Sequence, residues 1–154
     1  SEEFSFADYN VAKNEKEEFI FEDEKEDDDK SNFDFENYET TILEPIRPLE
    51  NFLKKLIVGD GRENGELQNY IDQMLDNAAL SSKVGFELIA NMHKIVAYSL
   101  KRIKLNKIEA DDENIEGIRA CLIVIVAVVR RKEVDISGYL NKAETFGKRI
   151  IQIK

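Results

Sequence analysis

From about residue 40 onward, hydrophobic residues are spaced three or four positions apart with polar residues between them. This spacing places the apolar side chains on one face of a helix, because an α-helix turns once in 3.6 residues. The pattern predicts five helices. Their apolar positions are Leu49, Phe52, Leu53, Leu56 and Ile57; Leu67, Tyr70, Ile71, Met74, Leu75 and Ala78; Leu88, Ile89, Met92, Val96 and Ile103; residues 120–129; and Ile136, Tyr139, Leu140, Ala143, Phe146, Ile150 and Ile153.

Side chains that cap helices indicate where two of these helices begin. Ser81 or Ser82 is predicted to cap the third helix, and Asp111 or Asp112 the fourth, because short polar side chains accept hydrogen bonds from the free N–H groups of a first turn. The fifth helix is expected to begin near Asp135.

The fourth helix carries ten consecutive apolar residues, 120–129. Such a run has no polar face, so the other helices are expected to enclose it. Its β-branched residues leave a buried strand as the alternative, but the acidic residues before it and the basic residues 130–132 after it favour a helix. The run is too short to cross a bilayer, which takes ~20 residues. The fold class predicted is all-α: a bundle of about five helices with a buried central helix, formed by residues 39–154.

Negative charge is concentrated at the start of the chain. Residues 1–41 hold sixteen acidic and four basic residues, a charge of −12, whereas the remaining residues carry +2. This part shows little hydrophobic periodicity and buries too little apolar surface to offset the entropy of ordering it. Residues 1–38 are therefore predicted to form a largely disordered acidic interaction arm.

The arm contains a repeated Phe-x-Phe pattern at intervals of fourteen or fifteen residues. In an extended chain both rings of such a pair point to the same side, which suits paired pockets on a partner. The residues predicted to bind a partner are Phe4, Phe6, Phe19, Phe21, Phe33 and Phe35. The partner expected is a protein with a basic, pocketed surface; chance repetition, or docking of the arm on its own body, is the alternative.

Basic residues of the body form a second group of candidate binding residues. Arg102 and Lys104 lie in one cluster, and Arg130 and Arg131 in another. These clusters are interpreted as anion-binding patches, with a solvated surface as the alternative. We do not expect nucleic-acid binding, because the body's charge is only +2 and the arm would compete. The arm itself is a candidate ligand for these patches.

Catalytic chemistry finds little support in the sequence. His93 is the only histidine, so a two-histidine metal site is impossible, and no phosphate-binding or hydrolase motif is present. Histidine-phosphotransfer domains are bundles of similar size, but their motif places lysine three residues after the histidine, where this chain has Val96. A helical wheel puts His93 at the edge of an apolar face, half exposed. Cys121 is predicted to be a small buried hydrophobic residue. No enzyme activity, metal or cofactor is predicted.

These patterns together predict a non-enzymatic regulatory or adaptor protein. It would bind other proteins through its helical bundle and its acidic, Phe-containing arm. The sequence shows no secretory signal and no membrane span, so a cytoplasmic location is expected. Two alternatives stay open: a structural subunit that self-associates around residues 42–48, and a histidine-phosphotransfer-like bundle. The pattern does not determine the oligomeric state.

Overall fold

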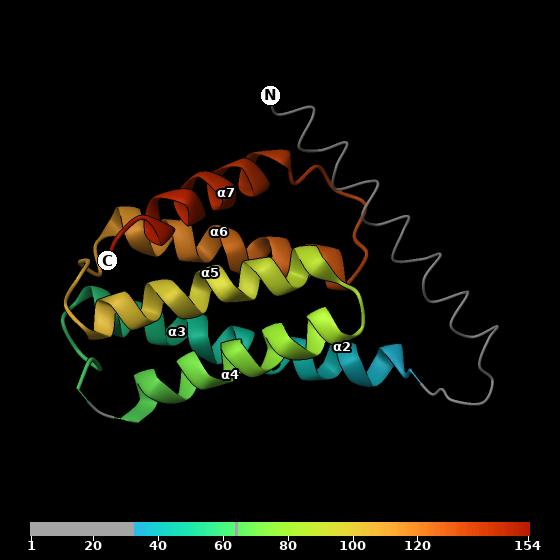
Figure 1. The fold of residues 1–154 in the computed structure, drawn as a ribbon, viewed down its shortest axis with the longest axis horizontal. Helices are drawn as coiled ribbons and strands as arrows, with labels where there is room; N and C mark the ends of the chain where they lie inside the picture. Colours follow the sequence, from blue (N-terminus) through green and yellow to red (C-terminus); the bar gives the residue numbers. More distant parts are fainter. Residues whose placement is uncertain (1–32, 64) are drawn as a thin grey trace.

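The computed structural model describes residues 33–63 and 65–154, and its regular structure within these ranges is entirely helical (Figure 1). The helices are α2 (Phe35–Leu43), α3 (Ile46–Ile57), α4 (Gly65–Lys83), α5 (Glu87–Lys104), α6 (Asp112–Val129) and α7 (Ser137–Ile151). Five of them, α3 to α7, correspond to the five predicted from hydrophobic spacing. The all-α prediction is confirmed.

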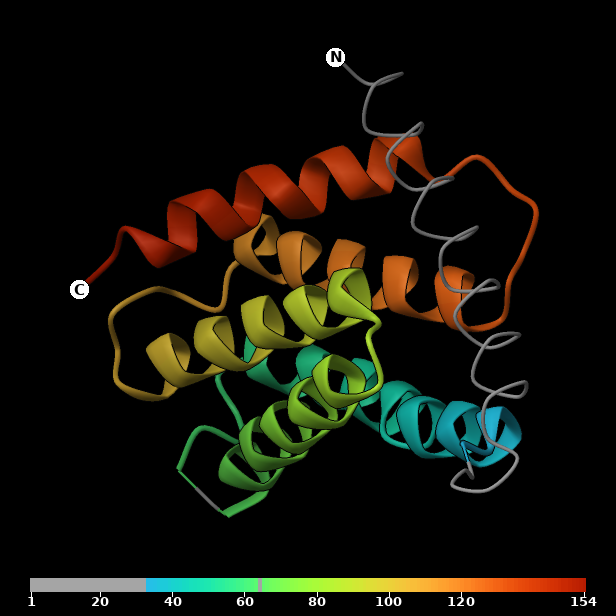
Figure 2. The same cartoon turned by 45° about the vertical axis from the view of Figure 1, so that its right-hand side comes forward.

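Helix α6 is the central element of the bundle. It packs against α5 and α7 along its length and against α2 and α3 on another side; Figure 2 shows it between α7 and the α2–α3 segment. Twelve of its eighteen residues are buried. This position explains why its sequence lacks a polar face, and the predicted buried central helix is confirmed.

The start of α6 agrees with the predicted cap, whereas the start of α5 does not. Asp111 Oδ1 accepts a hydrogen bond of 2.9 Å from the backbone N–H of Asn114. The prediction that Ser81 or Ser82 caps the next helix is wrong, because α4 continues through both to Lys83. The chain turns instead at Gly85, whose φ of +91° favours glycine, and α5 begins at Glu87.

Helix α2 was not predicted. Asp34 caps it by accepting a 3.1 Å hydrogen bond from the N–H of Asn37, and its Tyr38 and Ile42 side chains are buried. Residues 35–38, which the sequence analysis placed in the arm, form the first turn of this helix. The predicted disorder of the arm, and the residues Phe4, Phe6, Phe19 and Phe21, lie outside the described residues.

Two glycines allow close packing of α7 on its neighbours. A Cβ on Gly117 of α6 would lie 2.3 Å from the ring of Phe146 on α7. A Cβ on Gly147 of α7 would lie 2.5 Å from Ile95 of α5. The contact with the Phe146 ring therefore requires the absence of a side chain at Gly117, whereas a side chain at Gly147 would displace the terminal methyl of Ile95. None of the helices in the described part of the chain is long and apolar enough to span a bilayer.

Candidate functional site: a groove beside helix α6

The apolar run of α6 is not completely covered. Eight of its ten residues are buried, but Ile123 and Val126, one turn apart on the same face, remain partly exposed. They line a groove of about 530 Å³ bounded by α2, α3, α6 and the start of α7. The expectation of a fully enclosed run is therefore wrong at these two positions. A groove of this volume lies within the range of ordinary ligand sites.

The groove has an apolar base and partly exposed apolar walls. Its base is formed by four buried side chains: Ile46 of α3, Leu122 and Ala127 of α6, and Ile136 just before α7. Leu43 contributes a half-buried wall, and the side chains of Val134 and Tyr139 are 51% and 46% exposed. The surface can accept apolar side chains from another segment, because its own apolar groups are not covered within the described structure.

The rim of the groove is charged and predominantly basic. Arg47, Arg130 and Lys132 are exposed along it, together with the exposed carboxylate of Asp135 and the half-buried Glu50. Asp135 is already engaged, because its Oδ1 accepts hydrogen bonds from the backbone N–H and the hydroxyl of Ser137, at 2.9 and 2.7 Å. These bonds lower the pKa of the Asp135 carboxyl. Asp135 therefore stays negatively charged, but the three basic side chains outnumber the two carboxylates, so the rim is net positive and favours a ligand that carries negative charge.

A cluster of four aromatic rings lies where the chain enters the described structure. Phe33, Phe35, Tyr38 and Phe86 pack with ring centroids 5.2–6.2 Å apart. The guanidinium of Arg131 lies 4.4 Å from the centroid of the Phe35 ring, a cation–π contact. The third Phe-x-Phe pair thus packs on its own body, and the structure brings Phe35 together with the predicted basic residue Arg131.

The other two predicted basic residues lie at the far end of α5. Arg102 donates from Nε and Nη2 to the carbonyl oxygen of Ile153, at 3.1 and 2.9 Å, and Lys104 Nζ donates to Gln68 Oε1. Phe86 packs against Phe35, over which Arg131 lies, and it precedes α5 at the opposite end from Arg102. An 18-residue helix is about 27 Å long, so the two ends are far apart. Arg102 and Lys104 therefore do not share a surface with Arg130 and Arg131, and Arg102 holds the C-terminal segment against α5 through its bonds to Ile153.

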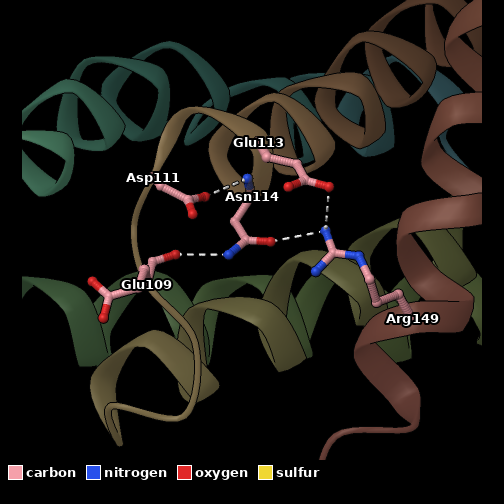
Figure 3. A network of polar contacts seen from close by, with 5 residues as sticks. All are labelled: Glu109, Asp111, Glu113, Asn114 and Arg149. Atoms are coloured by element: carbon pink, nitrogen blue, oxygen red, sulfur yellow. Dashed lines mark hydrogen bonds and ion pairs between the residues drawn. The ribbon is translucent and has the colours of Figure 1, made fainter.

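Sequence reasoning missed a polar network centred on Asn114 (Figure 3). Asn114 Nδ2 donates to the Glu109 carbonyl at 2.8 Å, and its Oδ1 accepts from Arg149 Nη2 at 2.9 Å. The same Arg149 nitrogen lies 3.8 Å from Glu113 Oε2. The network joins the start of α6 to α7. Because both ends of the Asn114 amide are bonded within the fold, we assign it a structural role.

His93 is fully buried, so the prediction of a half-exposed position is wrong. Its Nδ1 lies 2.9 Å from the Ile89 carbonyl oxygen, and its Nε2 has no hydrogen-bond partner. Burial lowers the pKa of His93 to about 4, against a smaller raising effect of the bond to Ile89. The ring is therefore neutral at pH 7 and out of reach of a phosphate donor.

The remaining reactive groups of the described residues are also enclosed or dispersed. Cys121 is buried, as predicted, and burial raises the pKa of its thiol to about 12. Within residues 33–63 and 65–154, no three His, Cys, Asp or Glu side chains lie close enough together to hold a metal ion. The groove is thus the strongest candidate for a functional site.

Comparison with known proteins adds no assignment: no family model, curated protein or solved structure matches this chain.

Proposed function

We propose that this chain is a non-enzymatic regulatory or adaptor protein that acts in the cytoplasm and binds a protein partner in the groove beside α6. One observation carries the proposal. Ile123 and Val126 belong to an otherwise buried apolar run, yet they line an open groove. Exposed apolar surface of this kind costs solubility and is typical of interaction sites.

The chemistry of the groove defines the kind of partner. Apolar or aromatic side chains would pack on Ile123 and Val126, and acidic residues beside them would face Arg130 and Lys132 on the rim. The partner segment is therefore acidic and carries large apolar side chains. For the arm, with its opposite charge, we propose a partner that has a basic, pocketed surface.

The burial of His93 and Cys121 supports a role without catalysis. A general base or nucleophile must reach its substrate, and these two side chains are enclosed in the core. The proposal therefore depends on binding alone.

The proposal is tested by affinity capture with the full chain and two matched variants. Ile123→Asp places a charge in the groove, whereas Ile151→Asp makes the same change at a side chain that is 65% exposed near the end of α7. We expect a partner that the wild type and Ile151→Asp retain and Ile123→Asp loses. The purified partner should bind the wild type and Ile151→Asp with similar affinity and Ile123→Asp more weakly. Retention by all three would contradict the proposal.

Self-association is the second candidate, since a specific observation favours it. Leu43 and Ile46, from the segment 42–48 predicted to self-associate, line the same groove. Sedimentation equilibrium separates the two functions. The adaptor proposal expects a monomer. A dimer that dissociates in the Ile123→Asp variant would instead support the function of a structural subunit.

A further inference from the structure

We infer that the groove beside α6 is occupied by the chain's own arm, with Phe19-Ile20-Phe21 packed against Ile123 and Val126. The inference rests on the proposed function, because it assigns a ligand to the same groove. It makes the arm the resident occupant that a partner protein has to displace.

The first step is the place where the arm joins the fold. The described chain begins at Phe33, whose ring packs 6.2 Å from that of Phe35, and Arg131 lies over the Phe35 ring. Arg130 and Lys132, on either side of Arg131 in the sequence, line the groove. The arm therefore leaves the helical body beside the basic rim.

The arm is long enough for Phe21 to reach the groove. Residues 22–32 separate Phe21 from Phe33, and an extended chain of this length spans about 36 Å. Helix α2 leads from Phe35 to Leu43, which lines the groove, over about 13 Å. The connecting residues are long enough to return along this helix without being fully extended.

The acidic residues that follow Phe19 and Phe21 distinguish this pair from the other two Phe-x-Phe pairs. Residues 22–29 contain seven acidic residues and one lysine, and they lie between Phe21 and the junction with the fold. With Phe19-Ile20-Phe21 in the groove, these acids face Arg130 and Lys132. Phe4 and Phe6 have no comparable acidic stretch after them, and Phe33 and Phe35 are already packed in the aromatic cluster.

Tethering makes weak contacts sufficient. A connection of eleven residues gives an effective concentration in the millimolar range, so the segment occupies the groove even if its affinity as a free peptide is modest. A partner in turn has to exceed this affinity, which restricts the groove to ligands richer in acidic and aromatic residues than the arm itself.

The experiment follows side-chain methyl groups by NMR in the full chain. Phe19→Ala with Phe21→Ala removes the proposed anchors, and Phe4→Ala with Phe6→Ala is the matched control. We expect the first pair to shift the methyl signals of Ile123 and Val126 and to leave those of Ile95, in the separate recess between α5 and α7, unchanged. The control pair should shift none of them. Unchanged Ile123 and Val126 signals, or equal shifts with both pairs, would overturn the inference.

A second pair of variants changes only exposed charges of the body. Arg130→Glu with Lys132→Glu should release the arm and reproduce the methyl shifts of the Phe19 and Phe21 variant, whereas Lys101→Glu with Lys148→Glu should not. The wild-type methyl signals should stay constant on tenfold dilution, as expected for docking within one chain. Signals that move on dilution would assign the groove to a second copy and overturn the inference.

These outcomes separate the inference from the proposed function. If the methyl signals do not respond to Phe19→Ala with Phe21→Ala, but a captured partner still depends on Ile123, the resident-arm inference fails and the adaptor function stands. If the signals respond as expected but no Ile123-dependent partner is found, the arm docks and the adaptor function fails.

Discussion

His93 is a neutral polar side chain inside the helical core. In the neutral imidazole, the Nδ1–H group donates a hydrogen bond to the Ile89 carbonyl oxygen, 2.9 Å away. Nε2 is then an acceptor without a partner. An unsatisfied buried acceptor costs about 1–3 kcal/mol. Protonation would cost more, because a charge would then be enclosed among apolar groups.

We predict that stability falls as the solution is acidified below pH 6.5. The folded-state pKa of His93, about 4, lies below its ordinary value of 6.5, so the unfolded chain binds a proton first. The contribution of neutral His93 to the free energy of unfolding is complete above pH 6.5 and is lost as the pH falls toward 4. Between pH 7 and 5 the free energy of unfolding should drop by about 2 kcal/mol from this group.

Urea denaturation of the wild type and of His93→Leu at the two pH values measures this effect. Carboxylates titrate in both proteins, so the difference between them isolates the histidine. The variant should lack the loss of about 2 kcal/mol. An equal pH dependence in the two proteins would contradict the assignment.

The burial of His93 could not be read from its own helix. A helical wheel built on the most apolar residues of α5 gives one face, with His93 at its edge. In the fold α5 packs against α4, α6 and α7, so the part of its circumference that is buried is wider than the apolar face and includes His93. The number of neighbours is a tertiary property, and a single-helix pattern does not contain it.

At the scale of the element, α2 depends on its packing. Nine residues are fewer than the ~12–15 that an isolated helix needs, so α2 is held by the burial of Tyr38 and Ile42 and by its Asp34 cap. The i, i+4 spacing of Tyr38 and Ile42 and the Asp34 cap are present in the sequence. The acidic composition around them obscured this signal.

We predict that Tyr38→Phe destabilises the protein by about 1–2 kcal/mol. The Tyr38 hydroxyl shares a 2.7 Å hydrogen bond with the buried hydroxyl of Ser81 on α4, and the substitution leaves Ser81 without this partner. Adding Ser81→Ala removes the orphaned group and should recover most of the loss. Thermal unfolding of both single variants and the double variant tests this; purely additive losses would show that the two hydroxyls do not interact.

Helix boundaries were predictable where one local signal acted alone. The Asp111 carboxylate has only its own helix to cap, and it does so. Ser81 is also a good capping residue, but its hydroxyl bonds to Tyr38, and α4 continues past it to Lys83 before the chain turns at Gly85. The competing partner is 43 residues away, so the sequence around Ser81 does not reveal it.

At the scale of the whole molecule, two neighbouring residues of α6 have different surroundings. Ile125 is fully buried, whereas Val126 lines the groove. From the sequence, aspartate at either position is expected to abolish folding. We now predict that Ile125→Asp abolishes it, because the cost of burying an unpaired carboxylate approaches the whole stability of a domain, about 5–15 kcal/mol. Val126→Asp should still fold.

Circular-dichroism melts of the two variants provide the measurement. A cooperative transition should persist in Val126→Asp and disappear in Ile125→Asp. A folded Ile125→Asp would contradict the placement of α6 at the centre, and an unfolded Val126→Asp would contradict the groove.

The sequence contains the components of the candidate site but not its location. It identified Arg130 and Arg131 as a basic patch and the Phe pairs as candidate anchors. The groove itself is formed by residues from Leu43 to Tyr139, which come from separate helices. Their proximity depends on how α2, α3 and α7 pack around α6. The apolar run also gave no sign that two of its ten residues would stay partly exposed.

The central claim is that this groove binds acidic segments with paired aromatic side chains, and a peptide of residues 15–29 tests it most directly. It is titrated into the full chain carrying Phe19→Ala and Phe21→Ala, and binding is followed by fluorescence anisotropy. The account predicts saturable binding that salt weakens, that a further Ile123→Asp reduces at least about tenfold, and that Ile151→Asp leaves unchanged. Absence of saturable binding, or equal affinity of the Ile123→Asp and Ile151→Asp proteins, would contradict it.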